Sequence, residues 1–262
     1  MHKSEIQTHL KYPDICALLD FVLSRMQEIL GEKFVGLYLY GSLVAGDFDY
    51  EISDVDLLAA VNYELNENEF HALDRMQDEA VENNPRWKNR IEIAYASRHA
   101  LKTFKTQRSR IAIISPGEPF HVKEAGKDWL LNWHFVRENG ITLFGAPPET
   151  IIAPVSKEEF ICAVREQANE WREYIIQTKH SRPFQAYAIL TLCRAFHAVK
   201  NGEQVSKSKA ARWAQTQLPE WSSLIEHALK WREAWRVGNV NHEATYLETK
   251  KFVGCVIGRI TD

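Results

Sequence analysis

The stretch FVGLYLYGSLVAGDFDYEISDVDLLAAV, residues 34–61, decides the fold of the first half of this chain. Its two β-rich runs, FVGLYLY and VDLLAAV, predict strands over residues 34–40 and 55–61. The segment between them begins with Gly41-Ser42 and, with the start of the second strand, carries five acidic side chains. So many carboxylates beside apolar strands indicate either a metal site or a strand with one solvated face.

Further strand and helix patterns extend this stretch into a domain. RIEIAYA, residues 90–96, has a period of two and predicts a third strand. One helical pattern opens at Pro13-Asp14 and closes at Gly31, and a second lies between the second and third strands. Strands interleaved with helices predict an α/β (α+β) domain with a small mixed sheet.

The second half of the chain is predicted to be an all-α helical bundle. Strand signals nearly vanish from Trp129 onward, and the proline-rich stretch at residues 143–156 marks a boundary between domains over residues 1–150 and 151–262. A capping box, Ser-Lys-Glu-Glu beginning at Ser156, starts the first helix of the bundle. We predict helices over residues 157–179, 184–200, 207–217, 220–237 and 242–259.

Composition narrows the classes of partner. The chain has 262 residues, 45% hydrophobic and 26% charged, which is typical of a globular protein. A net charge of −3 offers no basic field for nucleic acid and suits a neutral or cationic small molecule better. No stretch has the length of a membrane span, and the four cysteines, without a CxxC pair, predict reduced, buried thiols. We expect a cytoplasmic monomer that binds neither nucleic acid nor membrane.

The acidic residues suggest a metal site. Side chains two residues apart in a strand share a face, with Cα atoms roughly 6.5–7 Å apart, so Asp54 and Asp56 point the same way. Their like charges repel unless a cation lies between them, and two divalent ions could bind both carboxylates and a phosphate. Oxygen ligands favour Mg²⁺. In the third strand Ile91 and Ile93 fill one face, which leaves Glu92 on the other as a third carboxylate.

Each feature taken singly has a plainer interpretation. The aspartates can form the wet face of a strand, Glu92 can be an exposed edge residue, and Gly41-Ser42 can be a simple turn. The functional alternative is that Gly41 allows close backbone approach, so that N–H groups and the Ser42 hydroxyl cradle a phosphate. The combination of all these features favours the metal and phosphate site.

This combination resembles the DNA polymerase beta nucleotidyltransferase superfamily. LYGSLVAGDFDYEISDVDLL, residues 39–58, is most similar to aminoglycoside adenylyltransferases of the streptomycin and spectinomycin type. AILTLCRAFHAVKNGEQVSKSKAARWA, residues 188–214, is similar to the C-terminal helical domain of that family. The resemblance implies that Asp54, Asp56 and Glu92 bind two Mg²⁺ ions, with Glu92 also acting as the base that takes a proton from the acceptor hydroxyl.

The resemblance also implies a nucleotide site with contributions from both domains. ATP is the expected co-substrate, and Ser42 is expected to meet its β- and γ-phosphates. The residues expected to bind the nucleotide are Gly41, Ser42, Ser53, Arg194 and Lys207.

Two residues of the helical domain break local rules in a way that fits this expectation. Arg194 lies in a helix that is apolar around most of its circumference and should be largely buried, where arginine needs a partner. Lys207 falls in the first turn of a helix capped by Ser206, where the macrodipole disfavours a cation. A phosphate between them explains both observations. Alternatively, Arg194 pairs with a buried acid such as Glu170 and Lys207 points into water.

Three residues near the predicted boundary are candidates for the acceptor site. Trp129 and Trp133 could stack on a sugar or a base, or they could only pack between the domains. Asp128 could meet a cationic substrate, or it could cap a helix that begins at Trp129.

The sequence thus predicts a Mg²⁺-dependent nucleotidyltransferase. It would transfer AMP from ATP to a hydroxyl of a small molecule, an aminoglycoside-type antibiotic by resemblance, and release pyrophosphate; antibiotic resistance would follow. The helical domain would close the cleft over the nucleotide. The alternatives are a nucleotidyltransferase acting on a protein hydroxyl or another small molecule, and a catalytically silent nucleotide-binding protein with the same fold.

Overall fold

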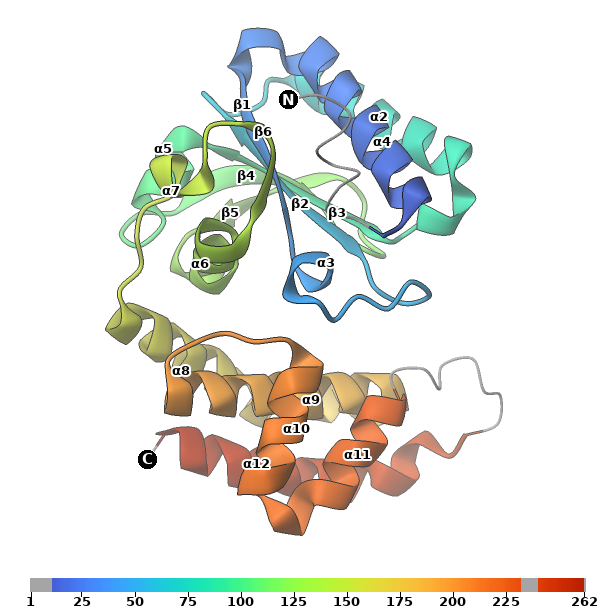
Figure 1. Cartoon of the computed structure of the whole chain (residues 1–262), viewed down its shortest axis with the longest axis vertical. Helices are drawn as coiled ribbons and strands as arrows, with labels where there is room; N and C mark the ends of the chain where they lie inside the picture. Colours follow the sequence, from blue (N-terminus) through green and yellow to red (C-terminus); the bar gives the residue numbers. More distant parts are fainter. Residues whose placement is uncertain (1–10, 232–239, 262) are drawn as a thin grey trace. The chain divides into compact units, whose positions relative to one another are not determined.

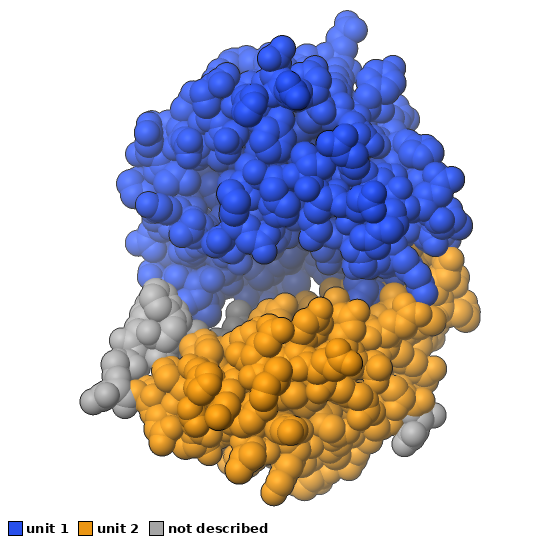
Figure 2. All heavy atoms as spheres, turned by 180° about the vertical axis from the view of Figure 1, so that it is seen from behind, with its two compact units in different colours: residues 1–154 blue, residues 155–262 orange. Residues whose placement is uncertain are grey.

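The computed structural model describes residues 11–231 and 240–261. The chain divides into two compact units, unit 1 over residues 1–154 and unit 2 over residues 155–262, which Figure 2 shows in separate colours. No helix in the described part of the chain combines the length and the apolar character that crossing a membrane requires.

Unit 1 is built on a six-stranded mixed sheet with the order β5-β4-β3-β2-β1-β6. β2 and β3 run parallel and the other neighbours run antiparallel. The predicted mixed sheet is therefore confirmed. The strands are β1 (Phe34–Tyr40), β2 (Val55–Val61), β3 (Ile91–Ser97), β4 (Ser109–Ile114), β5 (His121–Ala125) and β6 (Ile141–Gly145).

Helices cover the two faces of this sheet (Figure 1). α2 and α4 lie side by side on one face, and their apolar residues share a core with alternate residues of the strands, such as Leu37 and Leu39 of β1. Tyr38 and Tyr40 therefore point to the other face, where α6 packs against β1. The helices of unit 1 are α2 (Pro13–Leu30), α3 (Ser42–Ala45), α4 (Glu67–Asn83), α5 (Arg98–Thr103), α6 (Leu130–Asn139) and α7 (Pro148–Ile151).

Local signals explain where the long helices of unit 1 begin and end. α2 ends at Gly31, which has a φ of 51° and donates its N–H to the carbonyl of Gln27. α4 begins with a capping box in which the Asn66 side chain accepts from the N–H of Glu69 and the Glu69 side chain accepts from the N–H of Asn66. Both helices present their apolar stripes to the sheet.

The described residues of unit 2 form helices and the turns between them, as the sequence predicts. α9 packs against the other four, and its residues from Ala188 to Cys193 are buried, which accounts for its apolar composition. The capping box at Ser156 and Glu159 is present at the start of α8. The helices are α8 (Lys157–Tyr174), α9 (Arg182–Asn201), α10 (Lys207–Gln217), α11 (Ser222–Trp231) and α12 (Tyr246–Thr261).

Four of the five helix predictions in unit 2 differ from the structure at their ends, and the second, predicted over residues 184–200, runs over Arg182–Asn201. The first α-helix stops at Tyr174 and continues as a 3₁₀ turn over Ile175–Thr178. 3₁₀ turns also precede α11, at Pro219–Trp221, and α12, at His242–Thr245. Pro219 begins the turn before α11, and the Asn241 side chain caps the turn before α12, so each of these two turns has a local start signal. Residues 232–237 of the predicted fourth helix lie outside the described residues.

Among the described residues, one strand lies beyond Trp129, where the sequence carries almost no strand signal. β6 lies within this stretch and pairs antiparallel with β1, so part of the presumed linker belongs to the sheet. A five-residue strand has little periodicity of its own and depends on its partner.

The cysteine prediction holds only in part, because Cys162 is exposed and Cys255 is half-buried.

Candidate active site

A row of polar side chains crosses the sheet at the end of β1. The register pairs Tyr40 of β1 with Asp56 of β2, and Asp56 with Glu92 of β3. Because paired residues on neighbouring strands point to the same face, the three side chains lie next to one another. The sheet therefore brings together two of the predicted carboxylates, which are 36 positions apart in the sequence.

Both oxygens of Glu92 accept hydrogen bonds from hydroxyl groups. The Tyr40 hydroxyl donates to Oε1 at 3.0 Å, and the Ser115 hydroxyl, just after β4, donates to Oε2 at 3.2 Å. Burial first, and then the charges of Glu92 and Asp56, raise the pKa of Tyr40 well above its ordinary value. The phenol therefore stays protonated and donates. The sequence analysis missed Tyr40 and Ser115 because only the strand pairing places them beside Glu92.

Gly41 is required by its position between β1 and α3. Its backbone has a φ of 72° and a ψ of −147°, a combination that is nearly exclusive to glycine. A Cβ atom there would lie 1.8 Å from Oδ2 of Asp56. The Gly41 backbone therefore packs directly against a predicted metal ligand, which fits the close approach inferred from the sequence.

Asp54 is placed by the loop that precedes β2. The guanidinium of Arg90 donates to the carbonyls of Ser53, at 3.1 Å, and Tyr50, at 3.0 Å, and it lies over the ring of Trp87. Burial lowers the pKa of Arg90, while the charge of Asp54 opposes this shift. Arg90 thus fastens the loop beside the acidic residues, a role that its place two residues before Glu92 in the sequence does not reveal.

The two predicted serines have different surroundings. Ser42 is half-buried, is the first residue of α3 and accepts the N–H of Asp47 with its carbonyl. Ser53 is buried, and its hydroxyl accepts the N–H of Asp49. The Ser53 hydroxyl thus stabilises the loop, and its predicted contact with the nucleotide stays a prediction.

The carboxylates have the ligand chemistry that Mg²⁺ prefers. Asp54, Asp56 and Glu92 offer only oxygen donors, and Gly41 packs so closely against Asp56 that a side chain at Gly41 would collide with this carboxylate. Across residues 11–231 and 240–261, no three His, Cys, Asp or Glu side chains are grouped closely enough to hold one metal ion. The donor set therefore fits Mg²⁺ in type, and its assignment as a ligand set stays a prediction.

The predicted residues of unit 2 lie at a helix start and on the central helix. Ser206 caps α10 by accepting the N–H of Lys209, as predicted. The Lys207 ammonium lies 4.2 Å from the ring centroid of Tyr187, whose side chain is 45% exposed. Arg194 is half-buried on α9, and Glu170, the buried acid of the alternative interpretation, is exposed. Glu170 is therefore not a buried acid, and the partner of Arg194 in that alternative stays a prediction.

The predicted acceptor residues are arranged differently from one another. Trp129 and Trp133 are 8% and 1% exposed and stack on each other, with centroids 4.9 Å apart, so their visible role is packing. Asp128 accepts from the N–H of Gly126 and pairs with Arg108 at 3.2 Å. It does not cap α6, whose N-cap residue is Trp129, so the capping alternative is wrong. Contact of the three with an acceptor stays a prediction.

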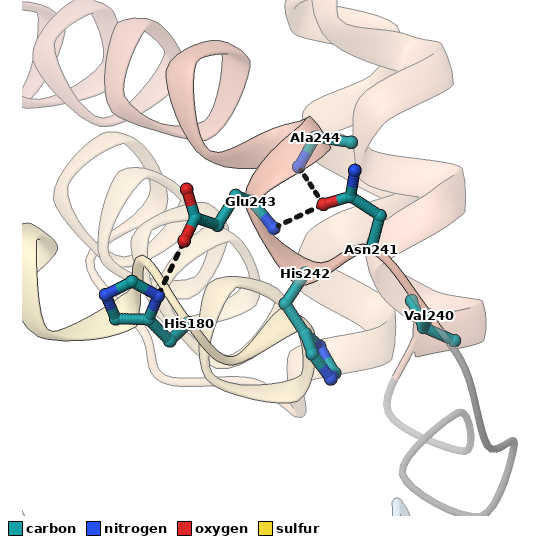
Figure 3. Close-up of a pocket in the computed structure, with 6 residues that line it drawn as sticks. All are labelled: His180, Val240, Asn241, His242, Glu243 and Ala244. Carbon is teal, nitrogen blue, oxygen red and sulfur yellow. Dashed lines mark hydrogen bonds and ion pairs between the residues drawn. The ribbon is translucent and has the colours of Figure 1, made fainter.

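Unit 2 also contains a pocket that involves none of these residues (Figure 3). Nδ1 of His180 lies 2.8 Å from Oε1 of Glu243, and the Asn241 side chain accepts the N–H groups of Glu243 and Ala244. These polar groups stabilise the 3₁₀ turn before α12. The lining residues are His180, Val240, Asn241, His242, Glu243 and Ala244.

Comparisons with known proteins agree with the fold. Residues 150–256 match the family model described as aminoglycoside adenylyltransferase, C-terminal domain. Spectinomycin 9-adenylyltransferases of Staphylococcus aureus strains Mu50 and N315 are 28% identical over 218 residues, 79% of this chain and 81% of theirs. The crystal structure of spectinomycin adenyltransferase from Enterococcus faecialis with ATP and spectinomycin has the same fold, with a TM-score of 0.73 and 15% identity over 94% of this chain and 99% of that one.

The mixed sheet of unit 1 and the helices of unit 2 give this chain the fold of that solved adenyltransferase. The chain is similar to the aminoglycoside adenylyltransferases, over residues 150–256 by the family model and over most of its length by the Staphylococcus aureus proteins. The comparisons support the resemblance inferred from the sequence.

Proposed function

We propose that this chain transfers AMP from ATP to a hydroxyl group of a spectinomycin-type aminoglycoside and releases pyrophosphate. The names of the relatives in Staphylococcus aureus support both the acceptor and the adenylyl group. The solved relative that holds ATP and spectinomycin shares the fold, which makes the same pair of substrates the first to test.

The observation that carries the proposal is the register of Tyr40, Asp56 and Glu92 across three strands, with Gly41 against Asp56. Two neighbouring carboxylates on one sheet face repel each other and lower the stability of the fold, so packing alone does not account for them. Oxygen ligands in such an arrangement suit a divalent cation and the phosphates bound to it.

The chemistry assigned to these residues is an in-line displacement at the α-phosphorus. Asp54, Asp56 and Glu92 would hold two Mg²⁺ ions, which supply charge neutralisation on the phosphates when bound. Glu92 takes the proton of the acceptor hydroxyl as the new oxygen–phosphorus bond forms and the bond to the pyrophosphate oxygen breaks. The electron pair of that bond leaves with pyrophosphate.

The proposed nucleotide contacts come from the end of β1, from within α9 and from the start of α10. The Gly41 backbone and the Ser42 hydroxyl would face the β- and γ-phosphates. In unit 2, Lys207 and Arg194 would supply positive charge to the nucleotide. The ammonium of Lys207 lies over the ring of Tyr187, which is 45% exposed.

The direct test is pyrophosphate release by the purified full chain with ATP and Mg²⁺. The acceptor panel contains spectinomycin, streptomycin and a protein extract, and Asp56→Asn is the inactive control. With spectinomycin, we expect the wild type to release pyrophosphate and Asp56→Asn to release none. Mass spectrometry should then show a product that is heavier by one adenylyl group. Release with the extract but with neither drug would instead identify another acceptor. MgATP binding without release for any acceptor would identify a silent nucleotide-binding protein.

The role in resistance has its own test. Expression of the chain in susceptible bacteria should raise the spectinomycin concentration that stops growth, and expression of Asp56→Asn should not. Equal protection by both forms would separate resistance from the proposed chemistry.

A further inference from the structure

The Glu92 carboxylate is held from two sides by hydroxyl groups that come from different strands. Tyr40, the last residue of β1, donates to Oε1, and Ser115, which follows β4, donates to Oε2. A carboxylate has about four lone-pair sites on its two oxygens, so these bonds leave about two sites for other partners. Rotation of the carboxylate about its terminal torsion would break both bonds.

Each of the two hydroxyls is itself fixed by the fold. Tyr40 is 6% exposed and is anchored by its pairing with Asp56. Ser115 begins a turn closed by a hydrogen bond of 3.0 Å from the N–H of Glu118 to its carbonyl. Pro116 occupies the second position and Gly117, with a φ of 81°, the third, as in a type II turn. Neither donor therefore depends on a mobile side chain for its place.

We propose that Tyr40 and Ser115 are positioning residues that fix the Glu92 carboxylate for proton transfer from the acceptor hydroxyl. This inference rests on the proposed function of Glu92 as the base. A freely rotating carboxylate would spend most of its time away from the acceptor proton, whereas the two hydroxyls select one orientation. Removing one of these hydroxyls would leave the charge of Glu92 unchanged but would let its carboxylate change orientation.

The chain provides a matched control for Tyr40. Tyr38 is two residues earlier on the same face of β1, is fully buried, and donates its hydroxyl to the carbonyl of Ala146 at 2.8 Å. Tyr38→Phe thus loses a buried tyrosine hydrogen bond that does not involve Glu92. For Ser115 the control is Ser115→Thr, which keeps the hydroxyl.

Steady-state kinetics give the first measurement. Tyr40→Phe and Ser115→Ala should each lower kcat by about tenfold, the usual effect of losing a hydrogen bond to a charged group, with the KM for ATP nearly unchanged. Tyr38→Phe and Ser115→Thr should stay within about threefold of the wild type. Equal losses in Tyr40→Phe and Tyr38→Phe, or a loss that appears only in the KM for ATP, would overturn the proposal.

A double-mutant cycle separates positioning from general structural damage. In a Glu92→Gln background the base is already lost, so adding Tyr40→Phe should lower the residual rate by less than about twofold. If Tyr40→Phe still costs about tenfold in that background, it does not act through Glu92, and the proposal fails.

A second cycle, on thermal unfolding, does not depend on the reaction. Tyr40→Phe should lower the Tm by about a few degrees, and by less when Glu92 is alanine. Identical Tm losses in both backgrounds would show that the contact contributes nothing in solution and would refute the proposal. The coupling could be present although the wild type releases no pyrophosphate with any acceptor. In that case the contact between Tyr40 and Glu92 would stand, but the proposed function and the assignment of Tyr40 as a positioning residue would both fail.

Discussion

Replacing Gly41 with alanine should disable the candidate active site, because its backbone touches Asp56. The added Cβ would lie 1.8 Å from Oδ2 of Asp56 and 2.6 Å from its Cγ, whereas ordinary contact begins at 3.4 Å. The carboxylate would have to move by more than 1 Å, and misplacement of about that size can cost about 10²-fold in rate. We therefore expect Gly41→Ala to lower kcat by about 10²-fold or more.

The same change should also lower stability. The φ of 72° and ψ of −147° at Gly41 strain an alanine backbone by about 1–3 kcal/mol. For a chain of this size each kcal/mol corresponds to about 2–4 °C in Tm. The protein should stay folded, so that loss of turnover can be measured on the native enzyme.

Gly46→Ala is the matched control. Gly46 ends α3 with a φ of 74°, but a Cβ added there would have no atom within 4 Å, so the variant carries backbone strain without the clash. Pyrophosphate release and differential scanning fluorimetry would be measured for both variants and the wild type. If Gly41→Ala keeps a kcat within about threefold of Gly46→Ala, the contact with Asp56 does not matter for catalysis, and the reasoning is refuted.

The remaining predictions concern the carboxylates and unit 2. Asp56→Asn should keep the far-UV circular dichroism of the wild type but abolish Mg²⁺-dependent turnover; full activity would refute the ligand assignment. Glu92→Gln should lower kcat by ~10²–10⁴ while the ATP affinity measured by calorimetry stays nearly constant. If kcat and ATP affinity are both lost, Glu92 acts mainly as a metal ligand and only secondarily as a base. Lys207→Ala should weaken ATP binding several-fold with an unchanged or slightly higher Tm. Lys209→Ala, in the same helical turn, should bind ATP normally. Equal ATP affinities of the two variants would show that unit 2 does not contribute to the nucleotide site.

Some elements could be predicted from the sequence because their signals are local. The strands over residues 34–40 and 55–61 match β1 and β2 at both ends, since short β-rich runs bounded by turn residues need no partner to be recognised. The start of α8 was also predictable, because Ser156 and Glu159 cap each other within one turn of helix. Arg90 and Ser115 carry no such local signal, since their functions depend on loops brought to them by the fold.

The sequence by itself determined the division into an α/β and a helical part, the Gly-Ser turn and the choice of the three carboxylates as candidates, each from a pattern among residues within a few positions of one another. Only the tertiary structure decided that β6 pairs with β1, that Tyr40, Asp56 and Glu92 form one row, and that Gly41 packs against Asp56. The physical reason is that periodicity and capping depend on neighbouring residues, whereas strand register depends on contacts between residues far apart in the chain, which leave no trace in local spacing.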